Sequence, residues 1–150
     1  MHRTAARIAL LALTVVQGSV GAMARLDPRG FYDDFPFGRA WVGPDGPYNE
    51  HLLTDFGAAL LAIAAVSLVG VWRPTREVVV AAALANIVLG AFHLAYHLGT
   101  TELYSTTDNV LSLGSIGLGV LLGLMLLPLA RGLGEAQPSK SDDLSERSSS

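Results

Sequence analysis

Four side chains that can bind protons or metal ions lie within or at the edges of long apolar runs. His51 and Asp55 are separated by one helical turn, and so are His93 and His97. On a helix this spacing places both members of a pair on one face. Imidazole and carboxylate groups are costly to keep in hydrocarbon unless they are paired, hydrated or ligated. The two pairs therefore indicate a binding site, and these residues are its candidate ligands.

The chemistry of this set leaves several kinds of site open. Imidazole nitrogen and carboxylate oxygen suit zinc, iron, copper or manganese, and helical bundles build metal sites from ligands on facing helices. A divalent or redox metal fits better than a haem held by two histidines, because a haem needs more room. A proton or a small polar ligand also suits an acid with histidines near water. A structural use, in which the residues cap helix ends and form one interhelical hydrogen bond, is the alternative.

The composition is that of a membrane protein. Hydrophobic residues make up 51% of the 150 residues and charged residues only 15%, a balance too apolar for an ordinary soluble domain. A helix needs about 20 residues to cross the hydrocarbon core of a bilayer. Four runs reach this length, at 5–24, 52–72, 78–98 and 110–130. We predict an all-α fold, a polytopic membrane four-helix bundle that occupies residues 1–133.

Charge and cysteine content exclude several functions. The net charge is −3 and no basic stripe is present, so we expect no nucleic-acid partner. The chain has no cysteine, which excludes disulfides, thiolate metal sites and iron–sulfur clusters. No catalytic motif accompanies the polar pairs, and the sequence leaves open whether the protein is an enzyme.

Positive charge is unevenly divided between the connections. Arginines precede the first run and fill the second connection, whereas residues 99–107 contain neither Lys nor Arg. Positively charged connections stay in the cytoplasm. With an arginine-rich, lysine-poor composition typical of GC-rich bacteria, we predict a multi-pass protein of a bacterial inner membrane with both termini cytoplasmic. The first run also fits a signal peptide cleaved after Ala22-Met23-Ala24, and cleavage would not invert the remaining topology.

The first connection, residues 25–51, is rich in aromatic residues, Pro and Gly. Its prolines and the Asp45-Gly46 pair specify turns, and its aromatic side chains need a surface to pack on. We predict an ordered outer cap over the bundle, whose polar members are Asp33, Asp34, Tyr48 and Asn49. An interfacial loop with its aromatic rings among the lipid headgroups is the alternative. Residues 134–150 are rich in Ser and mixed charges, which predicts a disordered cytoplasmic tail.

The predicted topology brings both polar pairs to the outer face. His51 and His97 lie at the mouth of the bundle, and Asp55 and His93 lie about one turn deeper. We expect Asp55 to meet His93, so that removing both costs less than the sum of the single changes. The polar residues expected to support this pocket are Asn86, Asp108, Ser112 and Glu50; Asp108 and Ser112 belong to the fourth predicted helix.

Small residues predict how the helices pack. Ser115, Gly119 and Gly123 recur every fourth position, the spacing that lets helix backbones approach closely in lipid. We expect this stripe to pack within the bundle, and a homo-oligomer or a partner membrane protein is the alternative use.

Several segments also carry a resemblance. The stretches GFYDDFPFG, RAWV and GPDGPYNEHLLTDFGA, followed by Ala-rich helices and HLAYHL, resemble small four-helix membrane proteins of actinobacteria, broadly similar to the DoxX-like group. The resemblance covers most of the chain outside the tail. It implies a four-helix bundle with an outer loop between its first two helices, and it implies no reaction. The residues it marks as family hallmarks are Asp33, Asp34, Tyr48, Asn49, Glu50, His51 and Asp55.

The sequence thus predicts an integral membrane protein with a polar pocket lined by His and Asp at its extracytoplasmic side. The pocket would bind or handle a metal ion, a proton or a small polar ligand, alone or as part of an accessory subunit. Two other classes stay open. One is a structural protein that binds a partner membrane protein through its small-residue helix faces and outer loop, and the other is a metal-dependent membrane enzyme.

Overall fold

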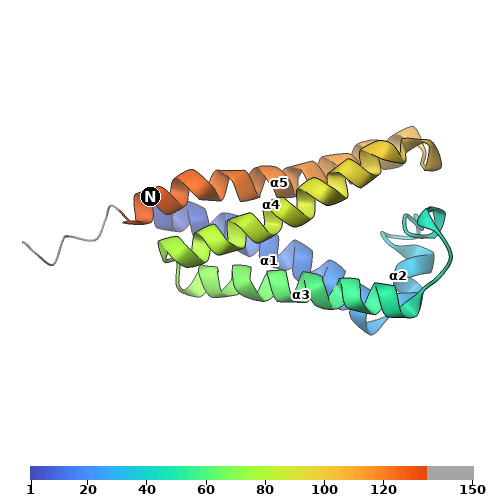
Figure 1. Ribbon diagram of the computed structural model, residues 1–150, viewed down its shortest axis with the longest axis horizontal. Helices are drawn as coiled ribbons and strands as arrows, with labels where there is room; N and C mark the ends of the chain where they lie inside the picture. The colour runs from blue at the N-terminus through green and yellow to red at the C-terminus, as the bar shows by residue number, and fades with distance from the viewer. Residues whose placement is uncertain (135–150) are drawn as a thin grey trace, which may run out of the picture.

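The computed structural model describes residues 1–134 (Figure 1). This part of the chain consists of helices and connections without a strand, which confirms the predicted all-α fold. Four helices are long and apolar enough to cross a membrane: α1 (His2–Leu26), α3 (Glu50–Trp72), α4 (Arg76–Gly99) and α5 (Thr106–Gly134). Each helix extends past the predicted run at both ends, except that α3 and its run both end at Trp72. The predicted tail, from residue 135 onward, lies outside the described residues.

Capping side chains explain why the helices begin where they do. The Asn49 side chain accepts a hydrogen bond from the backbone N–H of Leu52, at 3.1 Å, at the start of α3. The Thr75 side chain accepts one from Val78, at 3.4 Å, at the start of α4. These bonds satisfy N–H groups that have no partner within the helix. The polar caps, rather than the ends of the apolar runs, therefore set the boundaries.

The long helices form two pairs, α1 with α3 and α4 with α5 (Figure 1). The pairs meet at one end of the molecule and diverge toward the other. We call the first the basic end, because it carries Arg3, Arg7, Arg73 and Arg76, and the second the loop end. The core where the pairs meet joins α1, α4 and α5 through the buried residues Ala6, Ala9, Leu10, Leu13, Val79, Ala82, Ala83, Leu126, Ala130 and Leu133.

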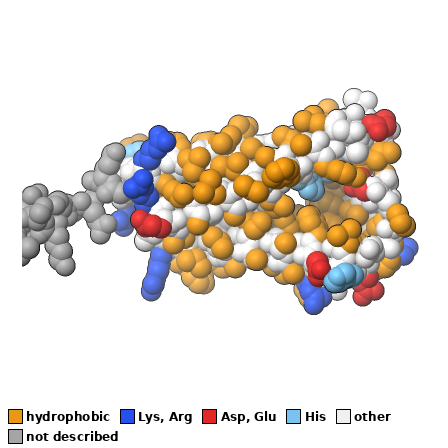
Figure 2. Space-filling view, in the orientation of Figure 1, with side chains coloured by type: hydrophobic (Ala, Val, Ile, Leu, Met, Phe, Trp, Pro, Cys, Tyr) orange, Lys and Arg blue, Asp and Glu red, His pale blue; other side chains and the backbone are white. Residues whose placement is uncertain are grey.

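The outer surface suits a lipid environment. Hydrophobic side chains cover the visible face between the two charged ends (Figure 2). Large apolar residues are exposed on all four long helices, for example Val15, Val66, Val88 and Leu121. Such a continuous apolar surface is unfavourable in water and favourable in a bilayer.

Two glycines bring α1 and α3 into backbone contact. A Cβ atom added to Gly57 would lie 2.6 Å from the backbone nitrogen of Arg25 and 2.8 Å from the carbonyl oxygen of Gly21. A Cβ atom added to Gly21 would lie 2.9 Å from the carbonyl oxygen of Gly57. Glycine permits this approach, as small residues do at helix interfaces in lipid.

One buried amide connects three helices at mid-depth. Asn86 of α4 is 2% exposed. Its side-chain nitrogen donates to Ser67 Oγ of α3 at 3.2 Å and to the Ala82 carbonyl at 2.8 Å, and its oxygen accepts from Gln17 Nε2 of α1 at 3.3 Å. Interhelical hydrogen bonds of this kind hold membrane helices in register. Asn86 therefore joins α1, α3 and α4 instead of lining the predicted pocket.

The predicted small-residue stripe on α5 divides between two environments. Gly123 faces α4, where an added Cβ atom would lie 2.8 Å from Ile87 Cγ1. Gly119 has open space around it, and Ser115 is exposed and donates to the Ser112 carbonyl at 2.9 Å. Only the Gly123 end of the stripe thus takes part in packing within the described residues.

The glycine contact between α1 and α3 predicts opposite effects of one substitution at two sites. Gly57→Ala should lower the free energy of unfolding by about 1–3 kcal/mol, the usual cost of overpacking. Gly114→Ala is the control, because Gly114 has open space around it. The control should be neutral or stabilising by up to about 1 kcal/mol, since alanine favours a helix more than glycine does. Unfolding in detergent micelles, followed by circular dichroism, measures both, and equal effects would contradict the close contact.

Candidate functional site beneath the folded loop

The connection between α1 and α3 is folded over the loop end. It contains α2 (Pro28–Asp34) and a short 3₁₀ helix, η1 (Gly43–Asp45). Phe31 of α2 is 3% exposed, and its ring centroid lies 4.6 Å from that of Phe35 and 6.3 Å from that of Phe56 on α3. These aromatic contacts attach one side of the loop to the α1 and α3 pair. We call residues 27–49 the folded loop.

The other side of the folded loop is attached to α5 by Asp108. Arg39 Nη1 donates to Asp108 Oδ1 at 2.6 Å, and Trp41 Nε1 donates to the same oxygen at 2.9 Å. The second carboxylate oxygen accepts from Ser105 Oγ at 2.6 Å. Hydrogen bonds to an ionised group are the strong ones. Asp108 therefore anchors the loop to α5 instead of lining the predicted pocket.

A second carboxylate joins the folded loop to the connection between α4 and α5. The Tyr104 hydroxyl lies 2.6 Å from Asp45 Oδ1 and 2.9 Å from the Trp41 carbonyl oxygen, and the Tyr96 hydroxyl lies 3.4 Å from the same Asp45 oxygen. Burial, the hydrogen bond to Asp45 and the charge of Asp45 raise the pKa of Tyr104. Tyr104 therefore stays protonated at neutral pH and acts as a donor to the loop.

His93 and His97 lie beneath this attachment. Their ring centroids are 4.8 Å apart. The His93 ring stacks on Phe56 of α3, at 6.3 Å and an interplanar angle of 18°. The His97 ring lies 5.8 Å from each of the rings of Tyr96 and Tyr104. The predicted pair thus lies on one face, between aromatic rings from two helices and the following connection.

The buried imidazole of His97 has an unused polar atom. His97 is 8% exposed, and its Nδ1 atom is the buried side-chain nitrogen or oxygen without a hydrogen-bond partner in residues 1–134. A buried polar group without a partner costs about 1–3 kcal/mol. Such a group in a folded protein calls for an explanation, of which a bound water or ion is one.

The other predicted pair faces away from these histidines. His51 Nε2 and Asp55 Oδ2 are 3.5 Å apart, and their side chains are 86% and 68% exposed. The structure therefore brings His51 to Asp55 and His93 to His97, but the two pairs do not share a pocket. Within residues 1–134, no three His, Asp or Glu side chains are close enough together to hold a metal ion.

The remaining predicted residues are dispersed over the loop end. Asp33 forms an exposed ion pair with Arg29, at 2.7 Å, and the Arg29 guanidinium lies 4.9 Å from the centroid of the Tyr48 ring. Asn49 caps α3, and Asp34 and Glu50 are exposed. Ser112 is buried and donates to the Asn109 carbonyl at 3.3 Å. None of these side chains approaches His93 or His97 through a hydrogen bond.

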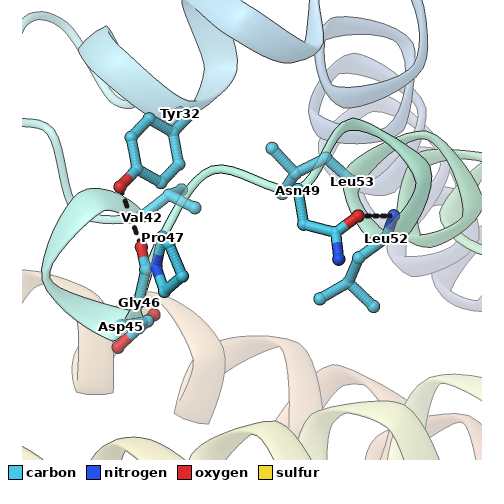
Figure 3. A pocket seen from close by; sticks show the side chains of 8 residues that line it. All are labelled: Tyr32, Val42, Asp45, Gly46, Pro47, Asn49, Leu52 and Leu53. Atoms are coloured by element: carbon cyan, nitrogen blue, oxygen red, sulfur yellow. Dashed lines mark hydrogen bonds between the residues drawn. The ribbon is translucent and has the colours of Figure 1, made fainter.

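A small pocket opens at the base of the folded loop (Figure 3). Its volume is about 100 Å³. One wall is held by the Tyr32 hydroxyl, which donates to the Gly46 carbonyl at 2.8 Å. Asp45 lines the same pocket and also accepts from Tyr104. The loop end therefore has a cavity large enough for a few water molecules next to the carboxylate that holds the loop closed.

Sequence reasoning missed the residues that build this closure. Arg39, Trp41 and Asp45 bind partners that lie between 51 and 69 positions away in the chain. No local spacing marks such pairs. The one signal available was the density of aromatic and charged residues at both ends of the closure, in the first and third connections.

Comparisons with protein-family profiles, with curated proteins and with solved structures found no match. The resemblance to the DoxX-like group therefore stays a prediction, and the function has to be argued from the geometry.

The anchoring role of Asp108 predicts how the loop responds to protease. Asp108→Asn removes the charge that holds Arg39 and weakens the acceptor for Trp41. We expect trypsin to cleave after Arg39 several times faster than in the wild type, because cleavage requires local opening of the loop. Asp34→Asn is the control, since the Asp34 side chain is exposed in the same loop. Equal cleavage of the two variants would show that Asp108 does not hold the loop.

Because the two pairs are separate, we expect substitutions in different pairs to have additive effects on the free energy of unfolding, whereas the sequence predicts that Asp55 and His93 are coupled. Asp55→Ala and His51→Ala should each leave the unfolding midpoint close to that of the wild type, because exposed ion pairs contribute little. The effects of Asp55→Ala and His93→Ala should add in the double variant. Unfolding in detergent micelles again provides the measurement. A double variant clearly milder than the sum would place Asp55 next to His93.

Proposed function

We propose that the protein is a membrane-spanning binding protein in which His93 and His97 bind a small polar ligand or a proton beneath the folded loop. The observation that carries this proposal is the buried, unpartnered Nδ1 atom of His97. An imidazole nitrogen without a partner can accept a hydrogen bond, bind a metal ion or take up a proton. A guest at this atom would remove the cost of leaving it unsatisfied.

The ligand set favours a hydrogen-bonding guest over a metal ion held by the protein alone. His93 and His97 supply two nitrogens, and in the described residues no third His, Asp or Glu side chain is placed to bind one metal ion together with them. Structural and catalytic zinc sites use three or four protein ligands. A metal ion at this pair would have to complete its coordination with water or another small molecule.

The aromatic surroundings suit a small guest that is mostly enclosed. Phe56, Tyr96 and Tyr104 lie around the two imidazoles and supply apolar walls. Binding sites for small molecules combine such walls with a few polar groups. Because Tyr96 and Tyr104 also contact Asp45 of the loop, occupation of the site and closure of the loop are coupled.

The charge distribution supports an orientation in a bacterial inner membrane. The arginines at the basic end favour a cytoplasmic location for both that end and the N-terminus. The loop end, with the histidine pair, then faces the extracytoplasmic side. In this orientation the site would take its ligand from outside the cell or the periplasm, alone or as part of an accessory subunit.

A second candidate function rests on the outer face of α3. His51, Asp55, Ala58 and Ala62 are all exposed on one side of this helix. Small and polar residues on a membrane-facing surface are typical of helix–helix contacts. This face therefore fits a partner membrane protein or a second copy of the chain.

Native mass spectrometry of the protein extracted in mild detergent distinguishes the two functions. A ligand site at His97 predicts a bound small guest in the wild type that is lost in His97→Ala and kept in His51→Ala. Where no guest survives extraction, added Zn²⁺ and changes of pH should shift the ¹⁵N signals of His93 and His97 together. The partner function would replace the ligand site if the wild type carried a second protein chain that Ala58→Leu loses, and if the ¹⁵N signals of both histidines did not change.

A further inference from the structure

The second cavity of interest lies at the basic end, far from the histidine pair. Its volume is about 550 Å³, within the range of small-molecule sites. It is lined by Arg3 and Arg7 of α1, by Arg73 and Arg76 beside the short connection between α3 and α4, and by Trp72, Pro74, Thr75, Glu77 and Leu133. Figure 2 shows arginine side chains, in blue, gathered at this end of the molecule.

The lining has a strong excess of positive charge. Four arginines face one carboxylate, that of Glu77. In residues 1–134 the arginine ion pairs are those of Arg29 and Arg39, both in the folded loop. The arginines of the basic end therefore have no carboxylate partner in the described part of the chain, although their mutual repulsion favours an anion between them.

The helix that starts here adds to the same field. The N-terminus of α4 lies at the cavity, with Thr75 and Arg76 in the lining. A helix N-terminus carries partial positive charge and free N–H groups, which favour phosphate and other anions. The Thr75 side chain accepts from the Val78 N–H and the Thr75 carbonyl from the Val79 N–H. The helix therefore adds mainly the partial positive charge of its N-terminus to that of the arginines.

The apolar part of the lining specifies the rest of the ligand. Trp72, Pro74 and Leu133 stand beside the arginines. A free anion gains no binding energy from this apolar surface, whereas a phospholipid can place its phosphate on the arginines and its acyl chains along the helices. Basic pockets between membrane helices bind acidic headgroups in this manner.

We propose that the cavity at the basic end binds the phosphate of an anionic phospholipid, held by Arg3, Arg7, Arg73 and Arg76. This inference is independent of the histidine site. Arginine suits the task because its planar group binds phosphate through two parallel hydrogen bonds. A lipid bound here would join α1 to the connection between α3 and α4, where the two helix pairs meet.

Short-chain lipids test this proposal on the full-length protein in neutral detergent. Dihexanoyl phosphatidylglycerol should bind saturably at one molecule per chain by native mass spectrometry. Dihexanoyl phosphatidylcholine should bind at least tenfold more weakly. Arg7→Gln and Arg73→Gln should each weaken phosphatidylglycerol binding by about fivefold, which corresponds to roughly 1 kcal/mol per basic residue.

Arg25→Gln is the matched control, because Arg25 is an exposed arginine at the far end of α1. It should leave binding unchanged. Equal effects of Arg25→Gln and Arg7→Gln, or equal binding of the two lipids, would overturn the proposal. Inorganic phosphate is a second arm: weak competition supports a lipid ligand, whereas binding as tight as that of phosphatidylglycerol would overturn the lipid and leave a free phosphate site.

The sequence beyond residue 134 contains acidic residues, whose competition for the same arginines has to be tested. Its acidic residues are Glu135, Asp142, Asp143 and Glu146. Replacing all of them by their amides in the full chain should alter phosphatidylglycerol binding by less than about twofold, a difference below 0.5 kcal/mol. Binding that appears only in this variant would make the acidic segment the occupant and overturn the proposal.

Discussion

Two carboxylates, Asp45 and Asp108, hold the loop end of this molecule together. The α1 and α3 pair and the α4 and α5 pair are each closely packed, but the pairs diverge toward this end (Figure 1). The folded loop bridges the gap, with aromatic contacts on one side and hydrogen bonds to α5 and to Tyr104 on the other. Hydrogen bonds to an ionised carboxylate are strong, so these two groups hold the folded loop to the α4 and α5 pair.

The same attachment determines the environment of the histidine pair. Tyr104 contacts the His97 ring and donates toward Asp45, so the ring that encloses the imidazole also holds the loop. Movement of the loop would expose His97, and a guest at His97 would favour one position of Tyr104. Coupling between a site and a closing element needs such a shared group, whose position differs between the two states.

The fold could be predicted because its signals are local. Apolar runs of membrane-spanning length gave the four helices, and aromatic and turn residues in the first connection gave a folded loop. The pairing of His93 with His97 follows from one helical turn and needs no tertiary information. Helix ends were less well predicted, since they depend on caps such as Asn49 and Thr75 that stand outside the apolar runs.

The sequence could not predict which face of α3 turns toward the bundle, and this orientation determines whether His51 and Asp55 can join the histidine pair. This helix is apolar on all sides, so polarity does not show which face turns inward. Two small-residue stripes lie side by side on α3, one with Ala58 and Ala62 and the other with Gly57 and Ala64. Neighbouring residues of a helix differ in direction by roughly 100°, so choosing one stripe instead of the other turns the helix by that angle. The structure selects Gly57, because only glycine allows the backbone contact with Gly21. His51 and Asp55 then turn outward with Ala58.

The two halves of the bundle differ in how their helices are held together. At the basic end one buried apolar core joins both helix pairs. At the loop end the buried apolar cluster of Ala24, Phe31 and Leu53 joins the folded loop to α1 and α3, and the contacts of the loop with Asp108 and Tyr104 are polar. Regions with few buried apolar contacts open at lower free energy than the core does. The loop can therefore open while the basic half stays folded, which is what the proposed site would need to exchange its ligand. Asn86 marks the level between the two halves, where α1, α3 and α4 are still joined.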